Sequence, residues 1–174
     1  MMDTMKIAPA ALTDIDEIVA LVNSAYRGDS SKKGWTTEAD LLEGQRIDAA
    51  SLQAIMQHPT HTILKCVNDE NKIIGTVLLE QHEDYFYLGM LTVQPDLQTS
   101  GIGKQLMNAA ETYAKANNVF TIKMTVISVR HELIAWYERR GYKNTGETKP
   151  FPTDIKFGIQ KQALEFIVME KHLP

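Results

Sequence analysis

The stretch Leu91–Leu106, which reads LTVQPDLQTSGIGKQL, decides the fold. Its first three residues suit a strand, and Pro95 ends that strand because proline has no N–H for a sheet ladder. Further along, apolar residues recur at the 3.6-residue period of an amphipathic helix, at Ile102, Leu106, Ala109, Ala110 and Tyr113. The stretch therefore predicts a strand, a glycine-containing loop and a helix in direct succession.

The loop places two glycines, Gly101 and Gly103, where the helix begins. The free backbone N–H groups and the positive dipole end of a first helical turn suit a phosphate, and glycine lets an anion approach the backbone closely. A P-loop would need GxxxxGK[ST], and a dinucleotide fingerprint would need a glycine where this chain has Leu106. Both nucleotide-binding loops are therefore disfavoured. The other interpretation is a glycine-rich turn that only caps the helix.

The pattern that is present, Gln-x-x-Gly-x-Gly after a strand and Val-x-Pro, resembles the GNAT acetyltransferase superfamily. The resemblance implies that this loop holds the pyrophosphate of an acyl-coenzyme A. It also implies that the pantetheine arm of the coenzyme lies along the preceding strand as an added strand would. The residues expected to bind the coenzyme here are Leu91, Thr92, Val93, Gln98, Thr99, Ser100, Gly101, Ile102, Gly103 and Lys104.

A second stretch, Arg130–Tyr142 (RHELIAWYERRGY), predicts a helix that ends at Gly141. It resembles the same family, and the resemblance implies that Tyr137 is the general acid. The family commonly has an asparagine seven residues earlier, where this chain has Arg130; we expect Arg130 to contact a coenzyme phosphate instead. The alternative for Tyr137 is a core aromatic whose hydroxyl bonds to the backbone.

The remaining periodicity predicts a sheet. Thr62–Val67, Lys72–Gln81 and Tyr85–Val93 read as an antiparallel meander. Thr121–Val126 follows the crossover helix and should lie parallel to Tyr85–Val93. The expected fold is a mixed α/β (α+β) GNAT-like domain with a central, mostly antiparallel sheet and helices on both faces. In such folds the two parallel strands splay into a V-shaped cleft.

Outside this core we expect a first strand at Lys6–Ala11, a helix at Ala49–Gln57, a turn-rich segment at Thr145–Pro152 and a final strand at Leu164–Glu170. The length of 174 residues suggests one domain over residues 1–174. Gly75, inside its strand, predicts a bulge or a close backbone approach.

Composition limits the function. The net charge of -4 without a basic run disfavours nucleic-acid binding, and one cysteine, Cys66, cannot form a disulfide within the chain. We see no transmembrane segment and no signal peptide, so we expect a cytoplasmic protein without a membrane partner. His58 and His61 flank Pro59, and we interpret them as a surface loop and not as a metal site. Exposed strand edges would permit a monomer or a homodimer.

The expected chemistry is the attack of an amine on a thioester, which needs no metal. The amine must first lose a proton, and the candidate bases are Glu80, Glu83 and Asp84. Glu80 has the best setting because it follows an apolar strand segment; the alternative is a solvent-facing strand end. Backbone N–H groups around Leu91 would stabilise the oxyanion if a bulge interrupts the ladder there.

The acceptor pocket is harder to predict. Arg27, Trp35 and Arg46 lie in the region that borders the acceptor in GNAT folds, and we take them as substrate-binding candidates. Local packing of the tryptophan and solvated arginines are an equal alternative. The predicted function is an N-acetyltransferase that uses acetyl-CoA as co-substrate and acetylates a primary amine of a small molecule or peptide in a ternary complex. The alternative is a non-catalytic acyl-CoA sensor or partner-binding module on the same fold.

Overall fold

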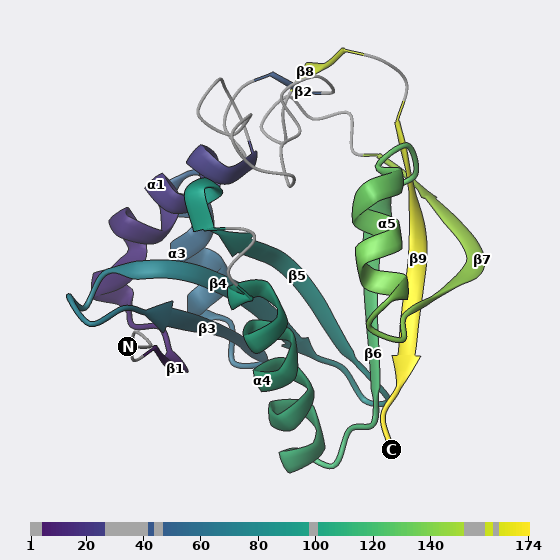
Figure 1. The fold of residues 1–174 in the computed structure, drawn as a ribbon, viewed down its shortest axis with the longest axis horizontal. Helices are drawn as coiled ribbons and strands as arrows, with labels where there is room; N and C mark the ends of the chain where they lie inside the picture. The colour runs from purple at the N-terminus through teal and green to yellow at the C-terminus, as the bar shows by residue number, and fades with distance from the viewer. Residues whose placement is uncertain (1–4, 27–41, 44–46, 98–100, 152–158, 162–163) are drawn as a thin grey trace.

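A computed structural model describes residues 5–26, 42–43, 47–97, 101–151, 159–161 and 164–174 (Figure 1). A seven-stranded sheet forms its centre, with the strands in the order β1-β3-β4-β5-β6-β9-β7. These strands are β1 (Lys6–Pro9), β3 (His61–Val67), β4 (Ile73–Gln81), β5 (Phe86–Val93), β6 (Thr121–Ile127), β7 (Lys143–Pro150) and β9 (Glu165–His172).

All neighbouring strands in this sheet are antiparallel except β5 and β6, which are parallel. The parallel pair is joined by the helix α4 (Ile102–Ala116). A parallel pair needs such a crossover because the chain must return to the same end of the sheet. The mixed, mostly antiparallel sheet predicted from the sequence is thereby confirmed.

Helices cover both faces of the sheet, as predicted (Figure 1). On one face, α1 (Ile15–Tyr26) and α3 (Ala49–Gln57) pack on β3, β4 and β5. On the other face, α4 and α5 (His131–Glu138) pack on the sheet in a larger core. Two 3-10 turns, η1 (Leu12–Asp14) and η2 (Pro95–Leu97), complete the connections within the described residues.

Gly75 explains how closely α4 approaches β4. A Cβ atom at this position would lie 2.9 Å from Leu106 Cδ1, 3.1 Å from Ile102 Cγ2 and 3.1 Å from the Thr92 carbonyl oxygen. The absent side chain therefore lets the first turns of α4 rest on the sheet. This confirms the close approach predicted at Gly75.

The segment Thr145–Pro152 was expected to be turn-rich, and this was wrong for most of it, because strand β7 spans Lys143–Pro150. The turn residues are absorbed by an irregularity, since the pairing with β9 jumps between Asn144 and Thr148 and Gly146 has a φ of 87°. Pro150 is tolerated because β7 is an edge strand.

The sequence reading also missed a second, two-stranded sheet, in which β2 (Leu42–Glu43) pairs with β8 (Ile159–Gln160). Strands of two residues are too short to show the alternation that predicts a strand. Within the described ranges, no helix has the length and apolar character needed to cross a membrane.

Candidate active site

The parallel strands β5 and β6 are in register only at Phe86↔Ile122 and Tyr87↔Lys123. Beyond Tyr87, β5 continues to pair with β4, while β6 pairs along its whole length with β9. The two strands therefore separate towards their carboxyl ends, which Figure 1 shows as a V opening between them. The splayed pair implied by the sequence resemblance is confirmed.

A bulge in β5 lies at the point of separation. Thr76 pairs with Thr92 and Leu78 pairs with Gly89, so β5 contains one more residue than β4 in this interval. Met90 has a φ of 47°, in the left-handed region that non-glycine residues rarely adopt. Bulges redirect the strand and interrupt its ladder. The interruption lies beside Leu91, where oxyanion donors were predicted; their role stays a prediction.

A cavity of about 120 Å³ fills the opening between β5 and β6. Two tyrosines tie its walls together: the Tyr26 hydroxyl donates to the Leu91 carbonyl, and the Tyr87 hydroxyl lies 2.6 Å from Thr125 Oγ1 on β6. The lining comes from α1, β5, β6, β9 and α5 and consists of Tyr26, Tyr87, Leu88, Gly89, Met90, Leu91, Met124, Thr125, Val126, Ile127, Arg130, Leu133, Tyr137 and Phe166.

Tyr137 is a buried residue of α5 on the wall of this cavity. Its ring meets those of Trp136 and Tyr142 edge to face, at centroid distances of 5.2 Å and 6.1 Å. Burial raises the pKa of Tyr137 far above its ordinary value; Tyr26 adds to the rise, and the Arg130 guanidinium opposes it. The phenol is therefore protonated at any physiological pH and faces a cation that would stabilise its anion.

Arg130 precedes α5 as its N-cap residue and is only 9% exposed. It lines the cavity together with Tyr137. A buried guanidinium on the wall of a cavity suits an anionic or carbonyl group. The sequence reading expected a coenzyme phosphate at Arg130, and that role stays a prediction.

Helix α4 follows the carboxyl end of β5 in the chain, with the 3-10 turn η2 between them. Gly101 is the N-cap residue, with a φ of 88°, and a Cβ atom there would meet none of the described residues within 4 Å. Gly103 has a different reason to be glycine, because a Cβ atom would lie 3.2 Å from Trp136 Cζ2. Ile102 is buried and Lys104 is exposed. Among the described residues, none therefore covers the backbone of the first turn at Gly101.

A second cavity, of about 430 Å³, lies between α3 and the sheet. Glu80 near the end of β4 lines it, whereas Glu83 and Asp84 are exposed in the turn between β4 and β5. Glu80 is thus the best placed of the three candidate bases. The other residues that line this cavity are Ile47, Asp48, Ser51, Ala54, Ile55, Leu78, Tyr87, Gly89 and Met90. The two cavities share Tyr87, Gly89 and Met90, so they adjoin at the bulge.

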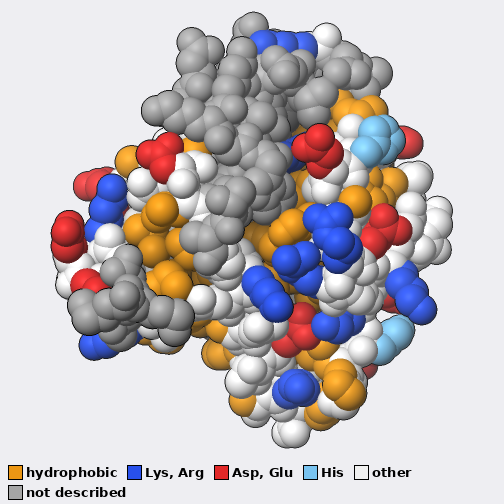
Figure 2. All heavy atoms as spheres, in the orientation of Figure 1, with side chains coloured by type: hydrophobic (Ala, Val, Ile, Leu, Met, Phe, Trp, Pro, Cys, Tyr) orange, Lys and Arg blue, Asp and Glu red, His pale blue; other side chains and the backbone are white. Residues whose placement is uncertain are grey.

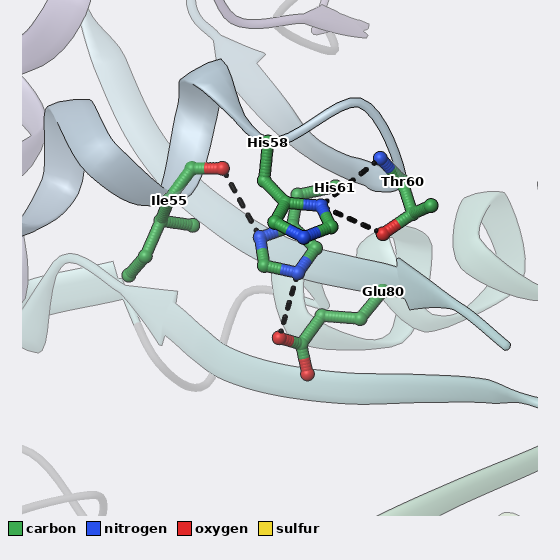
Figure 3. A network of polar contacts seen from close by, with 5 residues as sticks. All are labelled: Ile55, His58, Thr60, His61 and Glu80. Atoms are coloured by element: carbon green, nitrogen blue, oxygen red, sulfur yellow. Dashed lines mark hydrogen bonds and ion pairs between the residues drawn. The ribbon is translucent and has the colours of Figure 1, made fainter.

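Glu80 has a partner that the sequence reading assigned to a surface loop. His61 is the first residue of β3, and its Nε2 lies 3.0 Å from Glu80 Oε1 (Figure 3). The signal for this pair is the register of β3 and β4, which places the two residues opposite each other. Within the described residues, no three or more His, Cys, Asp or Glu side chains gather as metal ligands would.

Several predicted site residues lie outside the described residues. They are the coenzyme-loop residues Gln98, Thr99 and Ser100 and the acceptor candidates Arg27, Trp35 and Arg46. The sequence reading did not propose Tyr26 or Tyr87 for the site. Tyr26 is the last residue of α1 and Tyr87 lies in β5. The sequence signal for a site role at these positions is only that each side chain combines an aromatic ring with a polar hydroxyl.

Comparison with solved structures gives the same architecture. The ribosomal-protein-S18-alanine N-acetyltransferase from Escherichia coli has a TM-score of 0.73 at 14% identity and covers 98% of this chain and 94% of its own. The structure of yncA from Salmonella typhimurium, solved with its cofactor acetyl-CoA, has a TM-score of 0.69 at 16% identity, with the same coverage of 98% and 94%. At these identities the likeness shows the fold alone.

Sequence comparison adds the family. The uncharacterized protein YxbD from Bacillus subtilis (strain 168) is 27% identical over 77 residues, which are 44% of this chain. That match spans about half of the relative, 47% of its length. The family described as acetyltransferase (GNAT) domain matches residues 30–153, which is more than half of the chain. The chain belongs to the GNAT acetyltransferase family.

Proposed function

We propose that the chain is an N-acetyltransferase, which transfers the acetyl group of acetyl-CoA to a primary amine of a small molecule or peptide in a ternary complex. The observation that carries the proposal is the opening between β5 and β6, which has a buried phenol on its wall. The proposal treats residues 1–174 as one domain and requires no metal. The structure of yncA with acetyl-CoA supports the choice of donor.

The donor fits the described residues at two places. Past Tyr87, β5 has no register partner on β6 within the described part of the sheet, and we assign the amides of a pantetheine arm to this edge of β5, at Leu91, Thr92 and Val93. The first turn of α4, from Gly101, offers N–H groups and the positive dipole end to the pyrophosphate. No described residue would contact a Cβ atom at Gly101, which supports this position for the anion.

The acceptor amine is assigned to the cavity beneath α3, because this cavity adjoins the cleft at the bulge. An alkylamine arrives as its ammonium, with a pKa of about 10.4 in water, and must lose a proton before it can attack. Glu80 on the cavity wall is the proposed proton acceptor, directly or through one water. Asp48 lines the same cavity, so two acidic residues favour the entry of a cation.

The neutral nitrogen then attacks the thioester carbon and forms the C–N bond. Negative charge develops on the carbonyl oxygen, and backbone N–H groups beside the β5 bulge are the proposed donors to it. As the C–S bond breaks, the sulfur takes the proton of the Tyr137 hydroxyl, and the phenolate regains a proton from the nitrogen. Arg130 limits the cost of the transient phenolate, because it lowers the pKa that burial raises.

Thiol release from acetyl-CoA tests the proposal. The acceptor panel would contain an aliphatic diamine, an arylalkylamine, a peptide with a free N-terminus and a peptide with a lysine side chain. We expect amine-dependent release of coenzyme A and an acetylated product by mass spectrometry. Binding of acetyl-CoA in calorimetry without turnover of any amine would contradict the enzyme and support a non-catalytic sensor on the same fold.

A further inference from the structure

His61 and Glu80 form a partly buried polar pair on the acceptor side of the sheet. They are register partners on β3 and β4, with His61 Nε2 3.0 Å from Glu80 Oε1. Their side chains are 16% and 27% exposed. Figure 3 shows the imidazole between the Ile55 carbonyl and the Glu80 carboxylate. The pair therefore joins Glu80 on the wall of the 430 Å³ cavity to the last turn of α3, to which Ile55 belongs.

The hydrogen-bond partners of His61 indicate where its protons lie. Its Nδ1 lies 3.1 Å from the Ile55 carbonyl oxygen. A carbonyl oxygen only accepts, so Nδ1 carries a hydrogen. Nε2 then faces a carboxylate oxygen, and two atoms that offer only lone pairs cannot form a hydrogen bond. The 3.0 Å contact therefore holds one proton between His61 Nε2 and Glu80 Oε1.

The neighbouring histidine has the opposite arrangement. The Thr60 backbone N–H donates to His58 Nδ1 at 3.3 Å, so this nitrogen acts as an acceptor. The two rings stack with their centroids 4.2 Å apart and their planes at 17°. The stack keeps the His61 ring in place beside Glu80. Two further ionisable groups among the described residues lie near Glu80: Asp48 lines the same cavity, and Tyr87 is the β5 register partner of Glu80.

We propose that His61 and Glu80 act as one proton-accepting unit for the acceptor amine, with His61 as the positioning residue. The inference rests on the proposed function. The 3.0 Å contact is the protonated form of the unit. To act as a base, the unit first releases this proton to water and then carries one negative charge, while Nδ1 keeps its hydrogen bond to Ile55. The ammonium breaks one N–H bond and gives that proton to the unit, which becomes neutral as the amine gains its free electron pair.

The partnership matters because an imidazole nitrogen holds a proton more tightly than a carboxylate does. A carboxylate alone is a weak base towards an alkylammonium. When His61 Nε2 takes up the proton that the ammonium gives to Glu80, the carboxylate stays an anion and the imidazole carries the positive charge. The acceptor amine therefore loses its proton more readily. After the product leaves, the proton returns to solvent, to which both side chains are partly exposed.

Nitrogen-15 NMR of the imidazoles tests the pair without donor or acceptor. The chain has five histidines, which single substitutions assign. Over about pH 5 to 9 we expect His61 Nδ1 to keep its hydrogen while Nε2 loses one. Glu80→Gln should move that Nε2 step to lower pH by about one pH unit, which is about tenfold in proton affinity. Backbone spectra confirm that the variant is folded.

The exposed pair His172 and Glu170 provides a matched control, because its atoms are 3.5 Å apart and His172 is 73% exposed. Glu170→Gln should move the His172 step by only a few tenths of a pH unit, about 0.3 at most. If Glu80→Gln moves the His61 step no more than this, His61 and Glu80 do not share a proton and the proposal is overturned.

Kinetics test whether the unit serves the amine. With the panel amine that turns over fastest, His61→Gln should lower kcat about tenfold, leave the KM for acetyl-CoA unchanged and remove the limb of the pH–rate profile where histidine titrates. A pH–rate profile equal to that of the wild type would overturn the proton-accepting role. Failure of every amine would instead overturn the proposed function, whatever the NMR result for the pair.

Discussion

The packing of α4 on β4 can be tested by Gly75→Ala. The added Cβ atom would lie 2.9 Å from Leu106 Cδ1 and 3.1 Å from both Ile102 Cγ2 and the Thr92 carbonyl oxygen. The leucine terminus can rotate away, but the carbonyl belongs to the β4–β5 ladder and cannot. Overpacking of this kind costs about 1–3 kcal/mol. The reduced entropy of the unfolded chain returns about 0.4–1 kcal/mol.

At the midpoints of these two ranges the expected net loss in the free energy of unfolding is about 1.3 kcal/mol, which in a chain of this size lowers Tm by about 3–5 °C. Urea titration followed by circular dichroism measures it. Because Ile102 begins α4, the affinity for coenzyme A should also fall in calorimetry. Gly89→Ala is the matched control, since its nearest contact is the ring edge of Tyr87 at 3.2 Å. Gly75→Ala as stable as Gly89→Ala would refute this description of the packing.

Three further predictions concern the site. Tyr137→Phe should lower turnover about 100-fold and leave the affinity for the coenzyme unchanged. Tyr113→Phe is the control, because Tyr113 lines neither cavity, and it should leave turnover unchanged. An unaltered rate in Tyr137→Phe would exclude an acid role for Tyr137. Gly101→Val should abolish coenzyme binding in calorimetry because its φ of 88° suits only glycine and the side chain would occupy the anion's space; wild-type affinity would contradict the phosphate site. Burial raises the pKa of Tyr137 and of Tyr142, the latter also through Glu111, so the native state keeps protons that the unfolded chain loses above about pH 10. The free energy of unfolding should therefore fall above about pH 10, and a constant value up to about pH 11 would show that the phenols are not buried.

Local patterns predicted the elements that carry their own periodicity. The apolar stripe from Ile102 to Tyr113 identified α4, and the strand before Pro95 identified β5. The alternation of β6 was equally readable, because every second residue of its first six is buried. Strand β4 was readable for another reason, since its first seven residues are all buried and mostly apolar. Strand β7 was missed because Gly146 and Pro150 are turn signals that an irregular edge strand tolerates.

The candidate site depended more on register than on motif. Glu80 was recognisable as a carboxylate after an apolar run, but its contact with His61 arises only when β3 and β4 pair. The Tyr26 hydroxyl reaches Leu91 from a helix 65 residues away in the chain. The bulge at Met90 also has no sequence signal, because methionine rarely adopts a positive φ. Contacts between distant segments and local backbone irregularities are set by the assembled fold.

The charge of the surface around the cleft affects how the coenzyme site is best tested. Figure 2 shows Lys and Arg side chains gathered over the face that carries α4 and α5, next to hydrophobic atoms. Lys104, Arg139 and Lys143 are exposed residues of this part of the chain. A polyanionic ligand will be attracted to such a surface whether or not it enters the cleft. Affinity alone therefore does not locate the coenzyme.

A crystal structure of the complex with coenzyme A tests the central claim most directly. We expect the pyrophosphate within hydrogen-bonding distance of the backbone N–H groups that follow Gly101. The pantetheine arm should pair with β5 near Leu91, and the sulfur should lie next to the Tyr137 hydroxyl. A coenzyme bound elsewhere on the surface, with the opening between β5 and β6 empty, would contradict it.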